Sequence, residues 1–283
     1  MIYLALSIVV STFLYVVFQL FKRFKIHTLH AIVINYFVAF GCGLLFSNTS
    51  LSVHEIRQTP WFFGALGLGI LFVFIFNIMA ITVQRSGLSV ASVATKMSVV
   101  IPVIFGFFMY NESAGFLKII GILLALIAVY LASIKSKDGV KIRNLIFPIL
   151  LFLGSGIIDT SLKYQQNTHI KDENLAIFSA ITFLFAGLSG LLYAILKQDL
   201  KIGWKSILAG ICLGIPNYFS IVTLMKALAT EGLESSSVFT INNVGVVMLS
   251  TLLGLFFFKE RLLTKNWIGV LLAIISIFLV VYR

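Results

Sequence analysis

The sequence predicts an all-α polytopic membrane protein with ten transmembrane helices arranged as two inverted five-helix repeats. The 283 residues are 60% hydrophobic and only 11% charged, with a mean hydropathy of +1.07. A soluble domain is roughly half apolar and a quarter charged. Apolar runs of about 20 residues recur between short polar gaps, and lipid offers the backbone no hydrogen-bond partners, so these runs are expected to be helices. Parts of the first half also recur in the second half.

Ten apolar runs have about the length that a helix needs to cross a bilayer. No basic segment precedes the first run and no small-residue cleavage pattern clearly ends it, so we expect a retained helix rather than a signal peptide. Trp61, Trp204 and Trp267 each open a run and are expected to anchor it at the membrane interface. The predicted helices cover residues 2–20, 29–47, 61–83, 89–110, 115–134, 145–162, 175–196, 207–228, 235–258 and 263–282.

A basic connector in the middle of the chain separates the first five runs from the last five. We therefore predict a first five-helix repeat at residues 1–135, a basic linker at 136–143 and a second five-helix repeat at 144–283. Three pairs of segments match between the halves, with Gly87 opposite Gly232 and Thr95 opposite Thr240. An odd number of helices per repeat places the second copy upside down in the membrane. The matched segments are 85–95 with 230–240, 106–112 with 254–260, and 121–125 with 269–273.

The net charge of +11 comes from Lys and Arg residues that lie mostly between the apolar runs. They form no continuous basic face, so we expect contact with anionic lipid headgroups of the bilayer and no nucleic-acid partner. Most of them fall in the odd-numbered connectors, which places those connectors in the cytoplasm and both termini outside. The predicted location is the cell (inner) membrane, with multiple passes.

The repeated pattern resembles the EamA-type branch of the drug/metabolite transporter superfamily. The resemblance is carried by the Pro102-containing helix, by the turns Asn111-Glu112 and Lys259-Glu260, and by a Gly-x-x-x-Ala helix in each half. It covers nearly the whole chain, and it implies ten helices, a central cavity lined by helices one to four and six to nine, and alternating access. It implies no particular substrate, since relatives of this kind export amino acids and other metabolites or carry sugar phosphates or nucleotide sugars.

Two features set expectations within this resemblance. The second half has Val247 where the first has Pro102, and the front helices of the two halves match poorly, so we expect an asymmetric cavity. Glu112 and Glu260 are expected to tie a helix end to its neighbour rather than to bind substrate. Pro216, which precedes Asn217, could unwind the eighth helix.

Lys96 lies near the middle of the fourth predicted helix, where a charged side chain costs a few kcal/mol. Ser89, Ser92 and Thr95 share its helical face, which makes a polar stripe that ends in a cation. The functional interpretation is a counter-ion for an anionic group of a substrate. The alternative is that Lys96 snorkels to the interface or pairs permanently with an acidic residue.

Two further polar groups complete the candidate site. Asp159, in the sixth helix, is the obvious internal partner for Lys96, although Lys163 one turn later could neutralise it locally. Ser236, Thr240 and Asn243 form a second stripe at helical spacing. Two facing stripes would line a cavity, although Ser and Asn also hold membrane helices together without any ligand.

No pattern for catalysis or metal binding emerges. The four histidines lie at helix ends or in connectors, and no nucleophile motif or H-E-x-x-H arrangement occurs. We expect no catalytic residue, no metal and no cofactor. The histidines are His27, His30, His54 and His169.

The expected function is a secondary transporter that exports small polar metabolites, such as amino-acid-like or other anionic molecules, by alternating access around a central cavity. The alternatives that stay open are an exporter of hydrophobic cations or drugs and, less favoured, a membrane-embedded enzyme. A small-molecule substrate and the lipid bilayer are the expected partners, and a homodimer is compatible with the sequence. The predicted substrate-binding residues are Ser92, Thr95, Lys96, Asp159, Thr240 and Asn243.

Overall fold

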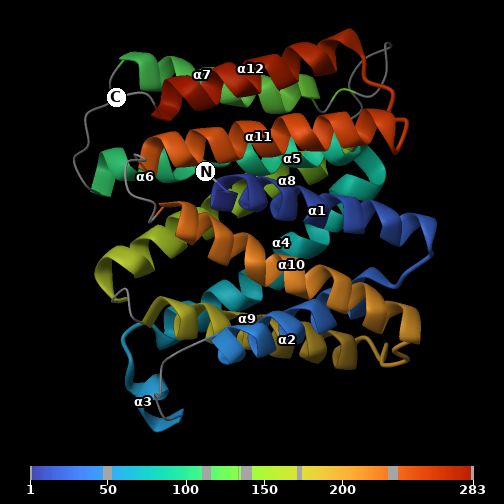
Figure 1. Ribbon diagram of the computed structural model, residues 1–283, viewed down its shortest axis with the longest axis vertical. Coiled ribbons are helices and arrows are strands. Elements are labelled where there is room, and N and C mark those ends of the chain that lie inside the picture. The colour runs from blue at the N-terminus through green and yellow to red at the C-terminus, as the bar shows by residue number, and fades with distance from the viewer. Residues whose placement is uncertain are drawn as a thin grey trace. The chain divides into compact units, whose positions relative to one another are not determined.

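The computed structural model describes residues 2–46, 53–109, 116–132, 134, 142–170, 174–228 and 235–281, and over these residues it contains helices and no strand (Figure 1). The prediction of an all-α chain is confirmed for them. Glu112 and most of the predicted linker at 136–143 lie outside the described residues. The helices are α1 (Ile2–Arg23), α2 (Thr28–Phe46), α3 (Val53–Gln58), α4 (Phe62–Ser86), α5 (Leu88–Met97), α6 (Val100–Met109), α7 (Phe116–Ala132), α8 (Ile142–Thr168), α9 (Leu175–Leu196), α10 (Trp204–Leu228), α11 (Ser235–Phe256) and α12 (Thr264–Val281).

Seven helical stretches of the described chain are long and apolar enough to cross a membrane. They lie in α1, α2, α4, α8, α9 and α10, with the seventh formed by Leu88–Phe105 of α5 and α6. Three shorter apolar stretches lie in α7, α11 and α12. Large apolar side chains such as Phe63, Ile70 and Phe74 of α4 are exposed, which suits contact with lipid rather than with water.

The fourth predicted helix, residues 89–110, is two helices rather than one. α5 ends at Met97 and α6 begins at Val100. Pro102 has no N–H to donate to the Ser98 carbonyl, four residues earlier, so one bond of the α-helical ladder is missing there. The Ile101 N–H bonds to that carbonyl instead at 2.9 Å. In α11, where the matching residue is Val247, the helix is continuous.

Pro216 does not interrupt its helix, so the expectation of an unwound eighth helix is wrong. α10 continues through it from Trp204 to Leu228. The neighbouring Asn217 is buried and its amide donates to Oδ1 of Asn35 at 3.2 Å. The Asn217 amide therefore bonds to α2, in a contact that holds α10 against it.

The chain divides into two compact units. Unit 1 comprises Met1–Leu20, Ile78–Ile157 and Phe219–Arg283, and unit 2 comprises Phe21–Asn77 and Ile158–Tyr218. The division falls inside α1, α4, α8 and α10, and each unit contains segments from both halves of the sequence.

In unit 1, α7 and α12 lie side by side (Figure 1). Small residues line the contact: Ala125, Ala128 and Ala132 of α7 and Ala273 of α12 are almost fully buried. A Cβ added at Gly269 would lie 2.6 Å from the backbone nitrogen of Ala132. Small side chains let two membrane helices approach closely and gain dispersion contacts, which is the main attraction available in lipid.

One buried side chain connects the end of α7 with the start of α12. The Asn266 amide donates to the carbonyls of Leu131 and Ala132 at 3.0 Å and of Ile134 at 2.8 Å. Its Oδ1 accepts from the Leu263 N–H at 2.7 Å. The last carbonyls of a helix have no partner within it, so this amide satisfies groups that would otherwise be unpaired.

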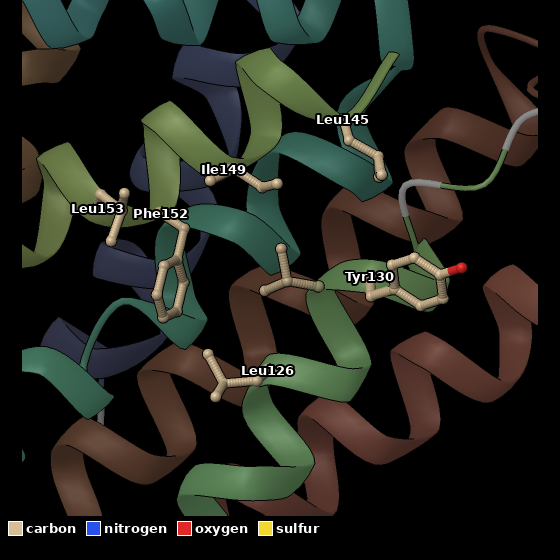
Figure 2. A pocket seen from close by; sticks show the side chains of 7 residues that line it. Leu126, Tyr130, Leu145, Ile149, Phe152 and Leu153 are labelled. Carbon is tan, nitrogen blue, oxygen red and sulfur yellow. The ribbon is translucent and has the colours of Figure 1, made fainter. Parts of the chain in front are cut away.

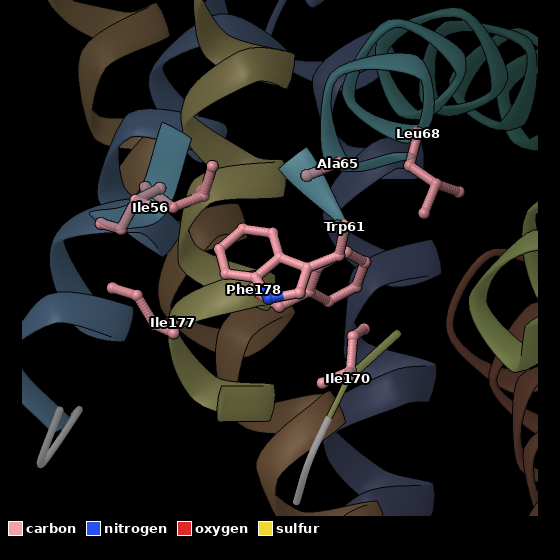
Figure 3. Close-up of a cluster of buried hydrophobic side chains, with 8 residues drawn as sticks. Ile56, Trp61, Ala65, Leu68, Ile170, Ile177 and Phe178 are labelled. Carbon is pink, nitrogen blue, oxygen red and sulfur yellow. The ribbon is translucent and has the colours of Figure 1, made fainter. Parts of the chain in front are cut away.

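In unit 2, α2 packs along α9, and a hydrophobic cluster forms around Trp61 (Figures 1 and 3). Trp61 is 1% exposed and meets Phe178 of α9 edge to face, with ring centroids 5.6 Å apart. The expectation that Trp61 is an interfacial anchor is therefore wrong. The short helix α3, which hydropathy did not predict, contributes Ile56 to the same cluster. Trp204, by contrast, is 67% exposed.

Candidate functional site

The N-terminus of α5 is held by a carboxylate from the turn after α11. Oε1 of Glu260 accepts from the Leu88 N–H at 2.6 Å, and Oε2 accepts from the Ser89 hydroxyl at 3.1 Å. An acidic group is favourable there because the first N–H groups of a helix are unpaired and carry partial positive charge. Gly87 has φ +99°, and a Cβ on Gly87 or Gly254 would collide with the carboxylate. For Glu260, the expected helix tie is confirmed.

The same carboxylate fixes how α5 and α11 pair. Because the start of α5 meets the residue that follows α11, the two helices run antiparallel, and they lie side by side (Figure 1). At the next level the hydroxyls of Ser92 and Ser250, both fully buried, are 2.6 Å apart. Lys96 lies one turn beyond this contact along α5, and Asn243 lies two turns beyond it along α11 in the same direction.

Lys96 occupies the last turn of α5, directly before the interruption at Ser98 and Val99. The carbonyl end of a helix carries partial negative charge, so a cation is favoured there. The side chain is half-buried. Interrupted membrane helices expose backbone polar groups only where protein or a water-filled cavity surrounds them. The carbonyl end of α5 therefore places polar backbone groups next to Lys96.

Two adjacent asparagines of α11 have different roles. Asn242 is 1% exposed, and its Oδ1 accepts from the Ser7 hydroxyl of α1 at 3.0 Å. Asn243 is 8% exposed and makes no side-chain hydrogen bond to another residue whose side chain the structure describes. Because the Asn242 amide is engaged with Ser7 and an asparagine amide can both donate and accept, Asn243 is the better candidate for a ligand.

The remaining predicted site residues are placed less directly. Thr95 donates back to the Ala91 carbonyl at 2.9 Å within α5. Ser92 donates to the Ser89 carbonyl at 3.0 Å in addition to its contact with Ser250. The side chain of Thr240 lies outside the described residues.

Asp159 is an exposed residue of α8 in unit 2, whereas Lys96 belongs to unit 1. Their pairing stays a prediction. Upstream in α8, Gly156 meets Ile101 of α6 so closely that a Cβ would overlap the isoleucine side chain. This agrees with the small-residue packing that glycine allows between membrane helices.

Sequence reasoning missed two groups of residues. Ser250 lies seven residues after Asn243 and so continues the same helical stripe, a signal that the spacing already contained. His27, His30 and Asp199 come together in unit 2, and these ligand types could hold a metal ion. The spacing of two residues between the histidines was the available signal, whereas Asp199 is too distant in sequence to be connected with them.

An apolar groove of unit 1 lies between α7 and α8, with a cavity volume of about 280 Å³ (Figure 2). Apart from Tyr130, whose hydroxyl is its polar group, the lining consists of hydrocarbon side chains. Without convergent polar groups it does not suit a polar metabolite. The lining residues are Leu126, Val129, Tyr130, Leu145, Ile149, Phe152 and Leu153.

Comparison with known proteins agrees with this architecture. The model of the EamA-like transporter family matches residues 1–134 and 146–282. A protein of Haemophilus influenzae, described only as uncharacterized, is 28% identical over 235 residues, which cover 81% of this chain and 78% of that protein. A crystal structure with 16% sequence identity covers 98% of this chain and 94% of its own, with a TM-score of 0.61, and shows similarity of fold alone.

Proposed function

Because this chain belongs to the EamA-like transporter family, we propose that it is a secondary transporter that exports small polar metabolites by alternating access. The family and the seven membrane-length helices make it a multi-pass membrane protein. The proposed substrate is amino-acid-like or otherwise anionic. The proposed location is the inner membrane, with both termini outside.

Lys96 is the observation on which the proposed substrate class rests. An ionisable group inside a membrane span is expensive and generally serves function. Here it sits at the carbonyl end of a half-helix, on the same side of the Ser92–Ser250 contact as the buried Asn243. A cation on α5 and, on the neighbouring α11, an amide that can donate and accept suit a carboxylate or phosphate with a further polar group.

The other predicted residues take supporting roles in the proposal. Thr95 and Thr240 add hydroxyls to the polar surface around Lys96. Ser92 reaches the substrate when its bond to Ser250 opens during the cycle. Asp159 either carries a proton or balances the charge of Lys96.

We further propose ten spanning helices in two inverted five-helix repeats, at residues 1–135 and 144–283. The seven long apolar stretches and the three shorter ones in α7, α11 and α12 support this number. Support for the repeat comes from α7 and α12, whose sequences match and which pack along each other. The interruption near Pro102, without a counterpart at Val247, supports an asymmetric cavity.

The first test is the thermal stability of the purified protein in detergent across amino acids, carboxylates, sugar phosphates and hydrophobic cations. A ligand that binds only the folded state stabilises by about 2.7 kcal/mol at 100 times its Kd. We expect stabilisation by an anionic metabolite in the wild type and in Lys205→Ala, which removes an exposed lysine at the start of α10. We expect none in Lys96→Ala.

The ligand found in this way is then tested for counterflow in vesicles. A carrier exchanges labelled for unlabelled substrate across the membrane, whereas an enzyme consumes it. Stabilisation only by hydrophobic cations, unchanged in Lys96→Ala, would replace the proposal with a drug-type exporter in which Lys96 is structural. Crosslinking in the same vesicles tests for a homodimer.

A further inference from the structure

Two histidines and an aspartate of unit 2 converge where α2 begins and α9 has ended. Nε2 of His27 lies 3.0 Å from Oδ2 of Asp199, and Nε2 of His30 lies 3.2 Å from Oδ1. The imidazole rings stack with centroids 4.0 Å apart, and the ligand atoms all lie within 4.8 Å of one another. We propose that these three side chains form a binding site for a divalent transition-metal ion of the zinc class.

The backbone between α1 and α2 fixes the two histidines. α1 ends in a turn in which Lys25 has φ +52° and the Ile26 N–H donates to the Phe21 carbonyl at 2.9 Å. His27 directly precedes α2, where its carbonyl accepts from the Ala31 N–H at 3.2 Å, and His30 is the third residue of that helix. The residue before a helix and the residue three positions later lie on the same side of it, so both imidazoles reach the carboxylate of Asp199.

A matching turn ends α9. Gln198 has φ +54°, and the Asp199 N–H donates to the Ala194 carbonyl at 3.0 Å, as in a helix C-cap with a left-handed residue. Because α2 packs along α9, this turn brings the carboxylate to the histidines. The ligands therefore come from two rigid turns on neighbouring helices rather than from a long loop.

The donor set identifies the class of ion. Two imidazole nitrogens and one carboxylate form a combination found at zinc sites that keep an open fourth position, whereas Ca²⁺ and Mg²⁺ prefer oxygen ligands. Bonds of about 2.0–2.2 Å with tetrahedral angles separate the ligand atoms by roughly 3.4 Å. The observed separations of 3.0 and 3.2 Å are close to this value. Because a metal ion lies in the plane of each imidazole that binds it, the stacked His27 ring must rotate to bind the ion, and its 50% exposure leaves room for that rotation.

The three ligands differ in exposure in a way that allows a metal ion both to enter the site and to be held there. His30 is 2% exposed and held in place, while His27 and Asp199 are 50% and 36% exposed. The open side leaves room for an ion to enter and for water as the fourth ligand. Without a metal ion, Nε2–H of His30 can donate a hydrogen bond to the backbone carbonyl of Asp199, 2.8 Å away.

The basic residues of the two connectors do not prevent this assignment. Nζ of Lys197 lies over the Tyr193 ring, 5.8 Å from its centroid, and so turns back along α9. Lys25 and Lys201 are exposed, and salt screens exposed charges. The carboxylate of Asp199 contacts both imidazoles and offsets the local positive charge.

The test uses the full-length protein in detergent, without a histidine tag and stripped with a chelator. Equilibrium dialysis with Zn²⁺ is expected to give one bound ion per chain, and Co²⁺ is expected to give the intense visible absorption of a tetrahedral site. His30→Ala and Asp199→Asn each change a ligand and are expected to weaken Zn²⁺ binding by more than about 100-fold. Changes to residues that only contact the ligands typically weaken metal binding by about 10–100-fold. Zn²⁺ is also expected to raise the melting temperature of the wild type only.

Two further variants make the result unambiguous. His27→Ala removes a half-exposed ligand, so the fold is retained even if His30→Ala proves unstable, and it too is expected to lose Zn²⁺. The control is His54→Ala, which removes an exposed histidine of α3 that pairs with Gln58 at 3.0 Å. It is expected to bind Zn²⁺ like the wild type.

The assignment is overturned if the wild type binds no Zn²⁺ at micromolar concentration. It is equally overturned if folded His27→Ala and Asp199→Asn variants bind Zn²⁺ as the wild type does. In either case the three side chains are a hydrogen-bonded group that joins two turns. Neither result depends on transport activity, so the proposed function is tested separately.

Discussion

The carboxylate of Glu260 accepts the backbone N–H of Leu88 at 2.6 Å and thereby joins the end of α11 to the start of α5. Hydrogen bonds to charged groups contribute about 1.5–3 kcal/mol. Glu260→Ala is therefore expected to lower the free energy of unfolding by about that amount, measured as thermal unfolding in detergent. The control is Lys259→Ala, which truncates the exposed residue directly before Glu260 and should leave the melting temperature nearly unchanged. Equal melting temperatures for both variants would contradict this role.

Gly87→Ala tests the same junction from the backbone. Gly87 has φ +99° and ψ 169°, a conformation open almost only to glycine, and a Cβ would lie 2.6 Å from Oε1 of Glu260. We expect a loss of at least about 1–3 kcal/mol. The matched control is Gly67→Ala in α4, where no heavy atom would lie within 4 Å of the added Cβ. Its expected effect has the opposite sign, a gain of up to about 1 kcal/mol from helix propensity.

Asn266→Ala is expected to destabilise the α7–α12 pair by about 2–3 kcal/mol, because it leaves buried carbonyls of α7 unpaired. Asn266→Asp separates the two functions of the amide. It keeps an oxygen for the Leu263 N–H but places an acceptor against the carbonyls, so it should be at least as destabilising as alanine. Lys265→Ala, at an exposed position, serves as the control in the same unfolding measurements. An Asp variant as stable as the wild type would argue against the bonds to α7.

Trp61→Ala should cost about 3–5 kcal/mol, as expected for a large side chain removed from a packed cluster. Trp204→Ala removes the same side chain from an exposed position and is expected to stay within about 0.5 kcal/mol of the wild type. The comparison is made by thermal unfolding, and intrinsic fluorescence gives a second readout because Trp61 lies in apolar surroundings. Similar losses in the two variants would contradict the buried placement of Trp61.

The helices themselves could be predicted because lipid imposes a single local solution on long apolar runs. The contrast between Pro102 and Val247 predicted an asymmetry that appears as an interrupted helix in one half and a continuous one in the other. The role of Glu260 as a helix tie was expected from the family resemblance, and its bond to the Leu88 N–H confirms it, although the sequence alone did not name that partner.

Other features depend on contacts that the local sequence does not contain. Trp61 opens an apolar run in the same way as Trp204, and only the packing of α3 and α9 around it makes it a core residue. Pro216 resembles Pro102 as a sequence signal, yet α10 stays helical around it. Asp199 meets His27 and His30 only because α2 and α9 pack together and each is preceded or followed by a left-handed turn.

The pair formed by α5 and α11 is held unequally along its length. A hydroxyl contact such as that of Ser92 with Ser250 contributes about 0.6 kcal/mol in a membrane bundle, whereas a hydrogen bond to a charged group such as Glu260 contributes about 1.5–3 kcal/mol. We therefore expect the two helices to separate more readily at the level of Ser92 than at Glu260. Such a separation would open the surroundings of Lys96 and Asn243 while the bond at Glu260 keeps the register between the two helices.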